Sequence, residues 1–321
     1  MKLSLIVIGV FLAVSAPGPR LCAQEEDLSP AENFSEYQSE PALQDADSLL
    51  SNSYTSQGSS TLRWYSMFTN IPGDWFLAGE SAFRPEGLPA MGGIALATGV
   101  LLLGDHQTYS FSHGMYTRSA DVRFASNQFL RAGDGKTTLE IAGAFALYGF
   151  VADDSRALRT ASGTVEALLA SGIAVQLFKR VAGRESPQVV TQGNGKWRPF
   201  PSIQTYNKNQ PRYYAFPSGH LTTEMATLTV IAENYPEMKW IRPVGYSIVG
   251  LTGVSLVNKG WHWYSDFPLA IAMGYTFGRL AAHHDDDASG QESSPASGTA
   301  SLRVLPNISP EGTGVTLALT F

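Results

Sequence analysis

The tetrapeptide Pro217-Ser218-Gly219-His220 combines a hydroxyl group, an unhindered backbone and an imidazole. Gly219 lets the backbone approach an anion closely, and a helix that begins near His220 would direct free N–H groups and a positive dipole end toward that anion. Ser218 would add a hydroxyl donor. The stretch therefore predicts an anion-binding helix start, although a Ser-capped helix with an incidental histidine has the same sequence.

A second histidine pattern follows, with His262 four residues before Asp266. On a helix this spacing places both side chains on one face, where the carboxylate can hold the imidazole in one tautomer. Trp261 and Trp263 flank His262, so a histidine packed in an aromatic core is the alternative interpretation.

Lys179 ends an apolar segment and begins the run Lys179-Arg180-Val181-Ala182-Gly183-Arg184-Glu185-Ser186-Pro187. Basic residues also gather at helix C-termini because they complement the helix dipole there. Transfer of a phosphoryl group needs cations, an in-line nucleophile and a proton donor. Lys179 and the two histidines offer these three functions.

In order and spacing, the three stretches resemble the type 2 phosphatidic acid phosphatase superfamily, which also includes class A acid phosphatases and vanadium haloperoxidases. The family's first stretch reads Lys, six residues, Arg-Pro, and its second reads Pro-Ser-Gly-His. Its third reads Ser-Arg, five residues, His, three residues, Asp. The resemblance implies an all-α fold, a six-helix bundle of the acid phosphatase/haloperoxidase type.

The resemblance also assigns roles to individual residues. His262 is the implied nucleophile, which forms a phosphohistidine, His220 is the general acid, and Asp266 orients His262. The implied phosphate-binding residues are Lys179, Ser218 and Gly219.

The chain departs from the family pattern at two positions. Ser186 and Leu256 occupy the places of the two motif arginines, whose bidentate contacts to phosphate neither residue can replace. Each lost donor would cost about 3 kcal/mol of transition-state stabilisation. We expect Arg184 and Lys259, which lie nearby in the sequence, to supply the two missing cations.

The predicted activity is that of a metal-independent phosphoric ester hydrolase that needs no cofactor. By resemblance, the substrate is a lipid phosphate, an isoprenyl diphosphate or a small phosphomonoester. Two alternatives stay open. One is a catalytically impaired phosphate-binding or structural envelope protein, and the other is a vanadate-dependent peroxidase with vanadium on His262.

The composition is that of a folded protein, with 44% hydrophobic and 16% charged residues in 321. This length is enough to bury a sizeable core. The net charge of −6 gives no indication of a nucleic-acid partner, which would require a clustered basic surface. The sequence does not indicate an oligomeric state.

The first 23 residues have the layout of a secretory signal: Lys2, an apolar run over residues 3–14 and a small-residue approach to a cut before Gln24. This predicts export to the periplasm or cell envelope, with membrane association left open. The one cysteine, Cys22, falls inside the signal, so we expect no disulfide in the mature chain.

Composition divides the remaining chain into four parts. We expect a disordered acidic leader (24–60), a helical phosphatase-like domain (61–282), a linker (283–300) and a C-terminal β-hairpin (301–321). Apolar segments without strand-like alternation predict six helices in the domain, over residues 88–103, 139–152, 160–179, 220–232, 243–257 and 266–282.

A membrane-spanning helix needs about twenty mostly apolar residues. The longest uncharged run in these segments, residues 87–104, approaches that length, and acidic residues such as Glu140 and Glu166 interrupt others. A charge at the bilayer centre is costly, so the pattern favours a soluble or surface-associated bundle.

Overall fold

The computed structural model describes residues 65–190, 193–290, 301–309 and 312–320. The predicted signal peptide (1–23), the acidic leader (24–60) and residues 291–300 of the predicted linker lie outside the described residues. Contacts within the chain separate two units, Met1–Ala282 and His283–Phe321, and each is described by itself.

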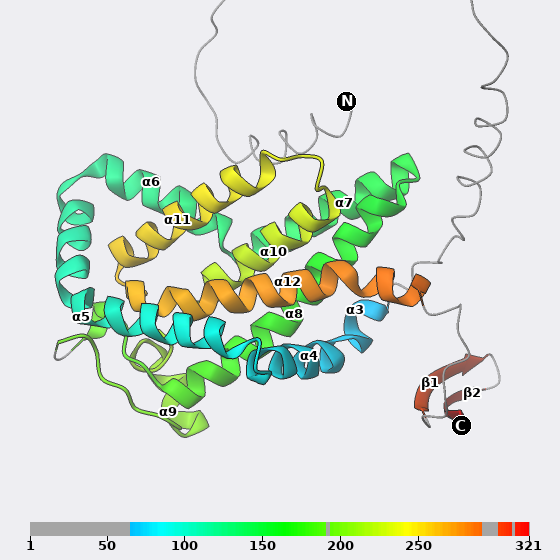
Figure 1. The fold of residues 1–321 in the computed structure, drawn as a ribbon. Helices are drawn as coiled ribbons and strands as arrows, with labels where there is room; N and C mark the ends of the chain where they lie inside the picture. Colours follow the sequence, from blue (N-terminus) through cyan, green and yellow to red (C-terminus); the bar gives the residue numbers. More distant parts are fainter. Residues whose placement is uncertain (1–64, 191–192, 291–300, 310–311, 321) are drawn as a thin grey trace, which may run out of the picture. The chain divides into compact units, whose positions relative to one another are not determined.

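The all-α prediction is confirmed, and all six predicted helices form (Figure 1). They are α5 (Leu88–Arg118), α7 (Gly135–Ala152), α8 (Ser155–Ala182), α10 (Gly219–Asn234), α11 (Ile241–Lys259) and α12 (Phe267–Gly290).

Two of these helices extend well beyond their predicted ends. Helix α5 continues past the polar residues Gly104-Asp105-His106 because Asp105 is buried and paired with a cation rather than exposed. Helix α12 continues to Gly290, so the first part of the predicted linker, residues 283–290, is helical. No residue between Ala282 and Gly290 is a strong helix breaker.

The structure contains further helices, which the pattern of long apolar segments does not predict. Helix α6 is polar on one face and begins at the cap Ser119, whose Oγ accepts a hydrogen bond from Val122 N (3.3 Å). The additional elements are α3 (Ser66–Thr69), α4 (Ile71–Phe83), α6 (Ala120–Ala132), α9 (Ile203–Lys208) and the 3₁₀ turns η1 (Pro187–Val189), η2 (Gln210–Arg212) and η3 (Tyr264–Asp266).

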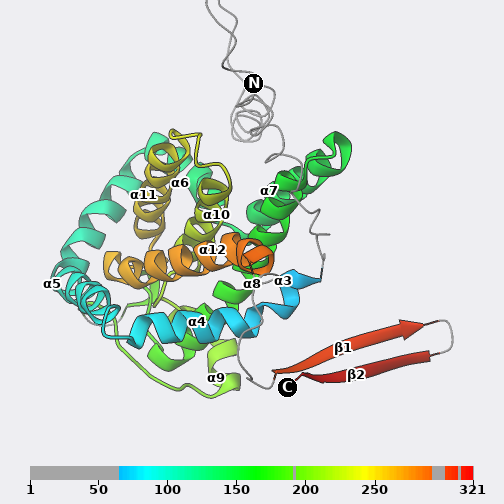
Figure 2. The ribbon, with the colours of Figure 1, turned by 45° about the vertical axis from the view of Figure 1, so that its right-hand side comes forward.

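Helix α10 packs against α7, α8 and α11, and it also lies close to α12. Glycines of α12 permit that close approach: a Cβ at Gly274 would lie 2.4 Å from the Thr222 carbonyl oxygen, and one at Gly278 would lie 2.6 Å from that of Ala226. Figure 2 shows α10 inside the helices and α5 at the outside. Buried side chains of α10 and its neighbours, such as Leu221, form the largest hydrophobic cluster.

Two helices of the described part, α5 and α8, are long and apolar enough to cross a membrane. About half of the apolar window of α8 is buried, as expected of a core helix, but only 6% of the α5 window is. Large apolar side chains of α5, among them Leu96, Val100, Leu103 and Phe111, are exposed. The outer surface of α5 is therefore more apolar than a soluble bundle requires.

The C-terminal unit contains strands β1 (Ser301–Ser309) and β2 (Gly312–Thr320). They pair antiparallel in register from Ser301 opposite Thr320 to Ser309 opposite Gly312. The β-hairpin expected from the alternating residues is present. The domain boundaries given from the sequence stay predictions.

Candidate active site

Three helix ends carry the predicted site residues. Lys179 lies in the last turn of α8, which stops at Gly183 with a left-handed backbone (φ 56°). Ser218 precedes the first turn of α10. His262 lies between α11, which ends at Gly260 (φ 80°), and the turn η3. Residues that are far apart in the sequence thus reach one region of the bundle.

Lys179 lies beside the N-terminus of α10. A Cβ placed on Gly219 would be 3.5 Å from Lys179 Nζ, so the glycine leaves room between the helix start and the ammonium group. The same Nζ is 5.2 Å from the centre of the Tyr214 ring. Burial lowers the pKa of Lys179 to about 8, although Asp266 acts in the opposite direction.

His262 is buried, and its tautomer follows from one contact. Nδ1 lies 2.6 Å from the Ala215 carbonyl oxygen and 3.4 Å from Asp266 Oδ2. A carbonyl oxygen can only accept, so Nδ1 carries the proton and Nε2 keeps its lone pair. Burial lowers the pKa of His262 despite the opposing effect of Asp266, so the ring is neutral at pH 7.

Asp266 joins the second and third predicted stretches. Its Oδ2 accepts a hydrogen bond from Trp263 N (2.7 Å), and its backbone carbonyl accepts one from Ser218 N (3.2 Å). Asp266 is therefore fixed through its carboxylate to the turn that carries His262 and through its backbone to the start of α10.

Arg184 is buried and bound by two carboxylates. Its Nη1 lies 2.5 Å from Asp266 Oδ1 and its Nη2 lies 2.7 Å from Asp105 Oδ2. Nη1 also donates to Ser265 Oγ (2.6 Å), and Nη2 donates to the Asn194 carbonyl (3.0 Å). Both terminal nitrogens of Arg184 thus already have anionic partners, which differs from the expected free phosphate ligand.

His220, in the first turn of α10, packs on Trp261 with ring centroids 5.5 Å apart. Burial, together with the nearby His262 and Lys179, lowers its pKa to about 4. His220 is therefore neutral at pH 7 in the site as described. A bound anion would oppose the positive neighbours and favour its protonation.

Ser218 caps α10. It is fully buried, and its Oγ accepts from Leu221 N at 3.5 Å. The sequence is compatible with either a helix cap or an anion site at Ser218. The geometry makes them compatible, because one cap bond leaves other N–H groups of the helix start unpaired within the helix.

Lys259 lies further out than the other predicted residues. Its Nζ is 3.4 Å from Asn127 Oδ1 and 5.8 Å from the Trp261 ring. Trp261 in turn contacts His220. Trp261 therefore contacts both Lys259 and His220, and Lys259 lies at the edge of the candidate site.

The two positions that lack the motif arginines are both buried. Leu256 belongs to the main hydrophobic cluster. Ser186 is bound through its backbone N–H to the Pro211 carbonyl (2.9 Å). Neither residue places a charge in the site.

Several residues of the site were missed from the sequence. The Ala215 carbonyl and the Asp105 carboxylate act through atoms that no motif identifies, and Tyr214 lies over Lys179. In the sequence, the one signal for Asp105 is that it directly follows a long uncharged run, residues 87–104.

Glu224, one helical turn after His220, is a buried acid that the sequence analysis did not assign to the site. Thr252 Oγ1 lies 3.1 Å from Glu224 Oε1 and 3.0 Å from the Phe129 carbonyl oxygen. A hydroxyl has one proton, so both contacts are hydrogen bonds if Glu224 is protonated and donates to Thr252. Burial raises the pKa of Glu224 to about 8, which agrees with this count.

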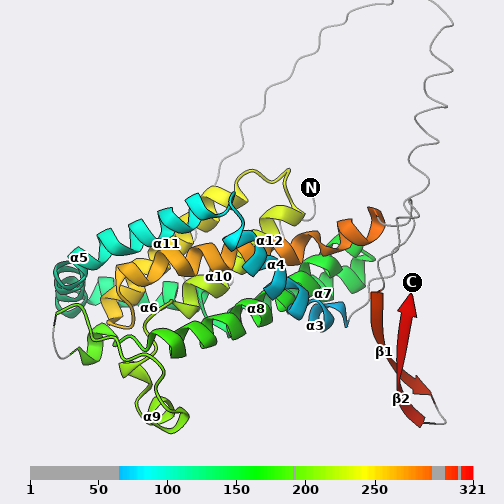
Figure 3. The ribbon, with the colours of Figure 1, turned by 60° about the horizontal axis from the view of Figure 1, so that its bottom comes forward.

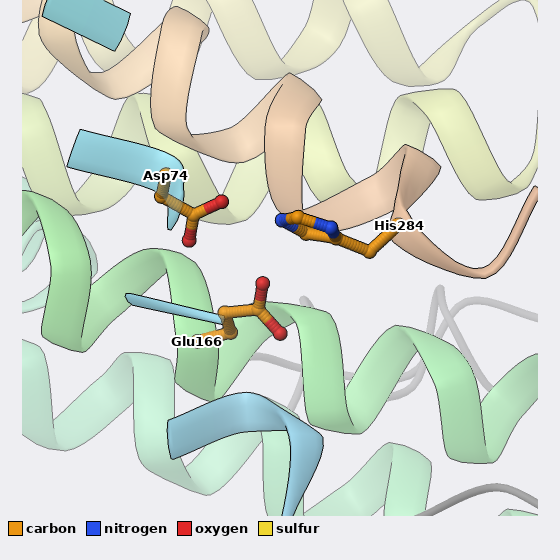
Figure 4. Close-up of side chains that lie close together, drawn as sticks. All are labelled: Asp74, Glu166 and His284. Atoms are coloured by element: carbon orange, nitrogen blue, oxygen red, sulfur yellow. The ribbon is translucent and has the colours of Figure 1, made fainter. Parts of the chain in front are cut away.

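A separate pair of buried carboxylates, Asp74 of α4 and Glu166 of α8, has oxygens within 4.8 Å of each other (Figure 4). Asn70 Nδ2 donates to Glu166 Oε2 at 3.2 Å. Glu166 lies thirteen residues before Lys179, about 20 Å along α8. The Asn70 hydrogen bond gives Glu166 a polar partner within the apolar helix, and the pair of carboxylates is not part of the histidine site.

Comparison with known proteins finds a family match over part of the chain. Residues 161–288 match the PAP2 superfamily. A lipid A 1-phosphatase of Porphyromonas gingivalis is 33% identical over 67 residues, which are 21% of this chain and 15% of that protein. The chain thus matches only a small part of that relative.

A solved structure, a transmembrane PAP2-type phosphatidylglycerolphosphate phosphatase from Bacillus subtilis, also matches. The identity is 15% and the TM-score is 0.39, over 70% of this chain and 97% of that one.

Proposed function

We propose that this chain, whose residues 161–288 match the PAP2 superfamily, is a phosphatase that removes a phosphoryl group from a phosphorylated lipid at a membrane surface. One observation carries the proposal. His262, fixed through Nδ1 to the Ala215 carbonyl, keeps a lone pair on Nε2 in the region of Lys179 and the start of α10.

In the first step, His262 Nε2 attacks phosphorus and the bond from phosphorus to the leaving oxygen breaks. His220 takes up a proton when the dianionic substrate binds, and it gives this proton to the leaving oxygen. Lys179 and the N–H groups at the start of α10 stabilise the charge that develops on the phosphoryl oxygens.

In the second step, water attacks the phosphohistidine. His220, now neutral, accepts the proton of this water, and inorganic phosphate leaves. Asp266 keeps the Nδ1 proton in place and stabilises the positive charge that His262 develops.

We place Arg184 behind Asp266 as a positioning residue. Its contacts of 2.5 Å and 2.7 Å with Asp266 and Asp105 fix the carboxylate that faces His262. Lys259 remains our candidate for a cation that reaches the substrate from the edge of the site.

The lipid substrate is supported by two observations. The relative from Porphyromonas gingivalis is a lipid A 1-phosphatase, and α5 presents exposed apolar side chains. Export to the periplasm or cell envelope is part of the proposal and rests on the signal-like segment 1–23.

The test is phosphate release from an aryl phosphate and from phosphatidate in mixed micelles, for the wild-type chain and for His262→Ala. We expect turnover of both substrates and its loss in the variant. A labelled phosphoryl group should stay on the quenched wild-type protein in alkali and leave it in acid. Turnover that persists in His262→Ala would contradict the assignment of the nucleophile.

A catalytically impaired phosphate-binding protein is the second candidate. It is favoured by the burial of Leu256 in the hydrophobic cluster and by the double pairing of Arg184. Under this alternative, orthovanadate would raise the melting temperature of the protein, yet no substrate would release phosphate.

A further inference from the structure

The connection between α8 and α10 differs in charge from the rest of the chain. Its residues 193–212, which we call the basic loop, contain Lys196, Arg198, Lys208 and Arg212 and no acidic residue. The whole chain, in contrast, has a net charge of −6. The basic loop is therefore the part of this connection that an anionic surface would attract.

The basic loop also exposes large apolar side chains. Phe200 is 74% exposed, Ile203 is 72% exposed and Trp197 is 43% exposed. Lys196 and Arg198 flank Trp197, and a mixture of apolar and basic side chains in one loop is typical of segments that lie in a membrane interface.

The backbone fixes the exposed position of Phe200. Its φ of 54° is left-handed, which is uncommon for a bulky residue and marks strain. Its N–H donates to the Arg180 carbonyl (2.9 Å), and Arg198 N donates to the Gly183 carbonyl (2.9 Å). The end of α8 thus holds Phe200 outward.

Three of the four basic side chains are available to a ligand. Lys196, Lys208 and Arg212 are exposed, and within the described ranges none forms an ion pair with a carboxylate. Arg198 differs, because its Nη1 lies 3.3 Å from Glu185 Oε1.

The basic loop is connected to the candidate active site. The Trp197 ring lies 5.3 Å from the ring of Phe216, which directly precedes the Pro-Ser-Gly-His stretch, and 4.9 Å from the Arg184 guanidinium. Figure 3 shows α9, which begins at Ile203, projecting from the bundle. A surface that binds this loop would thus lie beside the site.

We propose that the basic loop docks on the surface of an anionic lipid bilayer. Phe200 and Ile203 enter the interface, and Lys196, Lys208 and Arg212 contact the lipid phosphates. The net negative charge of the chain would be repelled by such a surface, so the loop also sets the orientation in which the protein approaches it. Docking in this way does not depend on hydrolysis.

The test uses the full chain with Cys22→Ser and Ile203→Cys, labelled at the new thiol with an environment-sensitive fluorophore. The protein is added to phosphatidylcholine vesicles or to vesicles that also contain 30% phosphatidylglycerol. We expect a blue-shifted emission in the anionic vesicles, at least fivefold weaker binding to phosphatidylcholine, and reversal by 0.5 M salt. Replacing Lys196, Lys208 and Arg212 together by Gln should remove the preference.

The control carries the label at Lys239→Cys, in the connection between α10 and α11 at the other end of α10. Its emission should be the same in both vesicles. Three results would each overturn the proposal. They are equal emission of the label at position 203 in the two kinds of vesicle, an equally large shift of the control label, and an unaltered preference for anionic vesicles in the triple variant. Because the fluorescence does not require turnover, it can be repeated with His262→Ala, which separates this result from the proposed activity.

Discussion

Two buried cations near Asp266 have different surroundings. Arg184 contacts the carboxylates of Asp105 and Asp266 directly, at 2.7 and 2.5 Å. Lys179 forms no ion pair within 4.0 Å in the part of the chain that the structure describes, and its pKa falls to about 8 because burial disfavours its charge.

The difference indicates which cation is structural and which is reserved for a ligand. A buried charge whose partners are supplied by the protein stabilises the fold only as long as all partners are present. A buried cation without a direct partner is held at a cost, which a bound anion can offset. Lys179 beside Gly219 is therefore the better candidate for contact with phosphate, and Arg184 for support of the site.

The largest expected effect concerns His262, the proposed nucleophile. His262→Ala should reduce kcat by about 10⁴-fold or more because the nucleophile is lost. The same steady-state assay of His106→Ala, an exposed histidine on α5, should match the wild type. A loss of less than tenfold for His262→Ala would show that another group attacks phosphorus.

The next effect is on stability. Arg184→Gln should lower the free energy of unfolding by about 3–5 kcal/mol, because it leaves two buried carboxylates without their cation. Chemical denaturation measures this change. Arg242→Gln, which breaks an exposed pair with Glu233 (3.1 Å), should cost less than about 1 kcal/mol and is the control. Equal costs for the two substitutions would remove the structural role of Arg184.

Lys179→Gln should have the opposite profile to Arg184→Gln. We expect kcat/KM to fall about 10²-fold, since one charged donor to the phosphoryl group is lost. The melting temperature should stay the same or rise, because a buried charge is removed. Orthovanadate should raise the melting temperature of the wild type, and it should raise the melting temperature of this variant much less. Lys136→Gln, on the exposed face of α7, should behave as the wild type in both assays.

The last test concerns Glu224, whose contribution to stability depends on pH. Its folded pKa of about 8 lies above the reference value of 4.5, so the native state holds the proton over this interval. The stability that protonated Glu224 contributes is complete below pH 4.5, and it is lost as the pH rises through about 8. His220, whose pKa is lowered, acts in the opposite direction between about pH 4 and 6.5.

Glu224→Gln keeps a donor for Thr252 but cannot ionise. Between pH 5 and pH 9, the free energy of unfolding of the wild type should therefore fall by on the order of 3 kcal/mol more than that of the variant. Denaturation curves at the two pH values give this difference. Parallel pH dependence of the two proteins would mean that Glu224 is ionised in the native state.

Much of the fold could be predicted from the sequence because its signals are local. Apolar segments without alternation gave the six helices, and alternating residues after 300 gave the hairpin. Helices α4 and α6 were missed because they are short or polar on one face. The continuation of α5 was missed because it depends on Asp105 being neutralised by Arg184, which lies 79 residues away.

For the site, the sequence by itself determined the types and order of the chemical groups, since Lys179, His220, His262 and Asp266 belong to recognisable spacings. Only the tertiary structure decided their surroundings. A spacing specifies neither which atom faces a ring nitrogen nor how much water a cation loses. The Ala215 carbonyl fixes the His262 tautomer, and carboxylate partners distinguish Arg184 from Lys179, because hydrogen bonding and ion pairing depend on groups that folding brings together from distant parts of the chain.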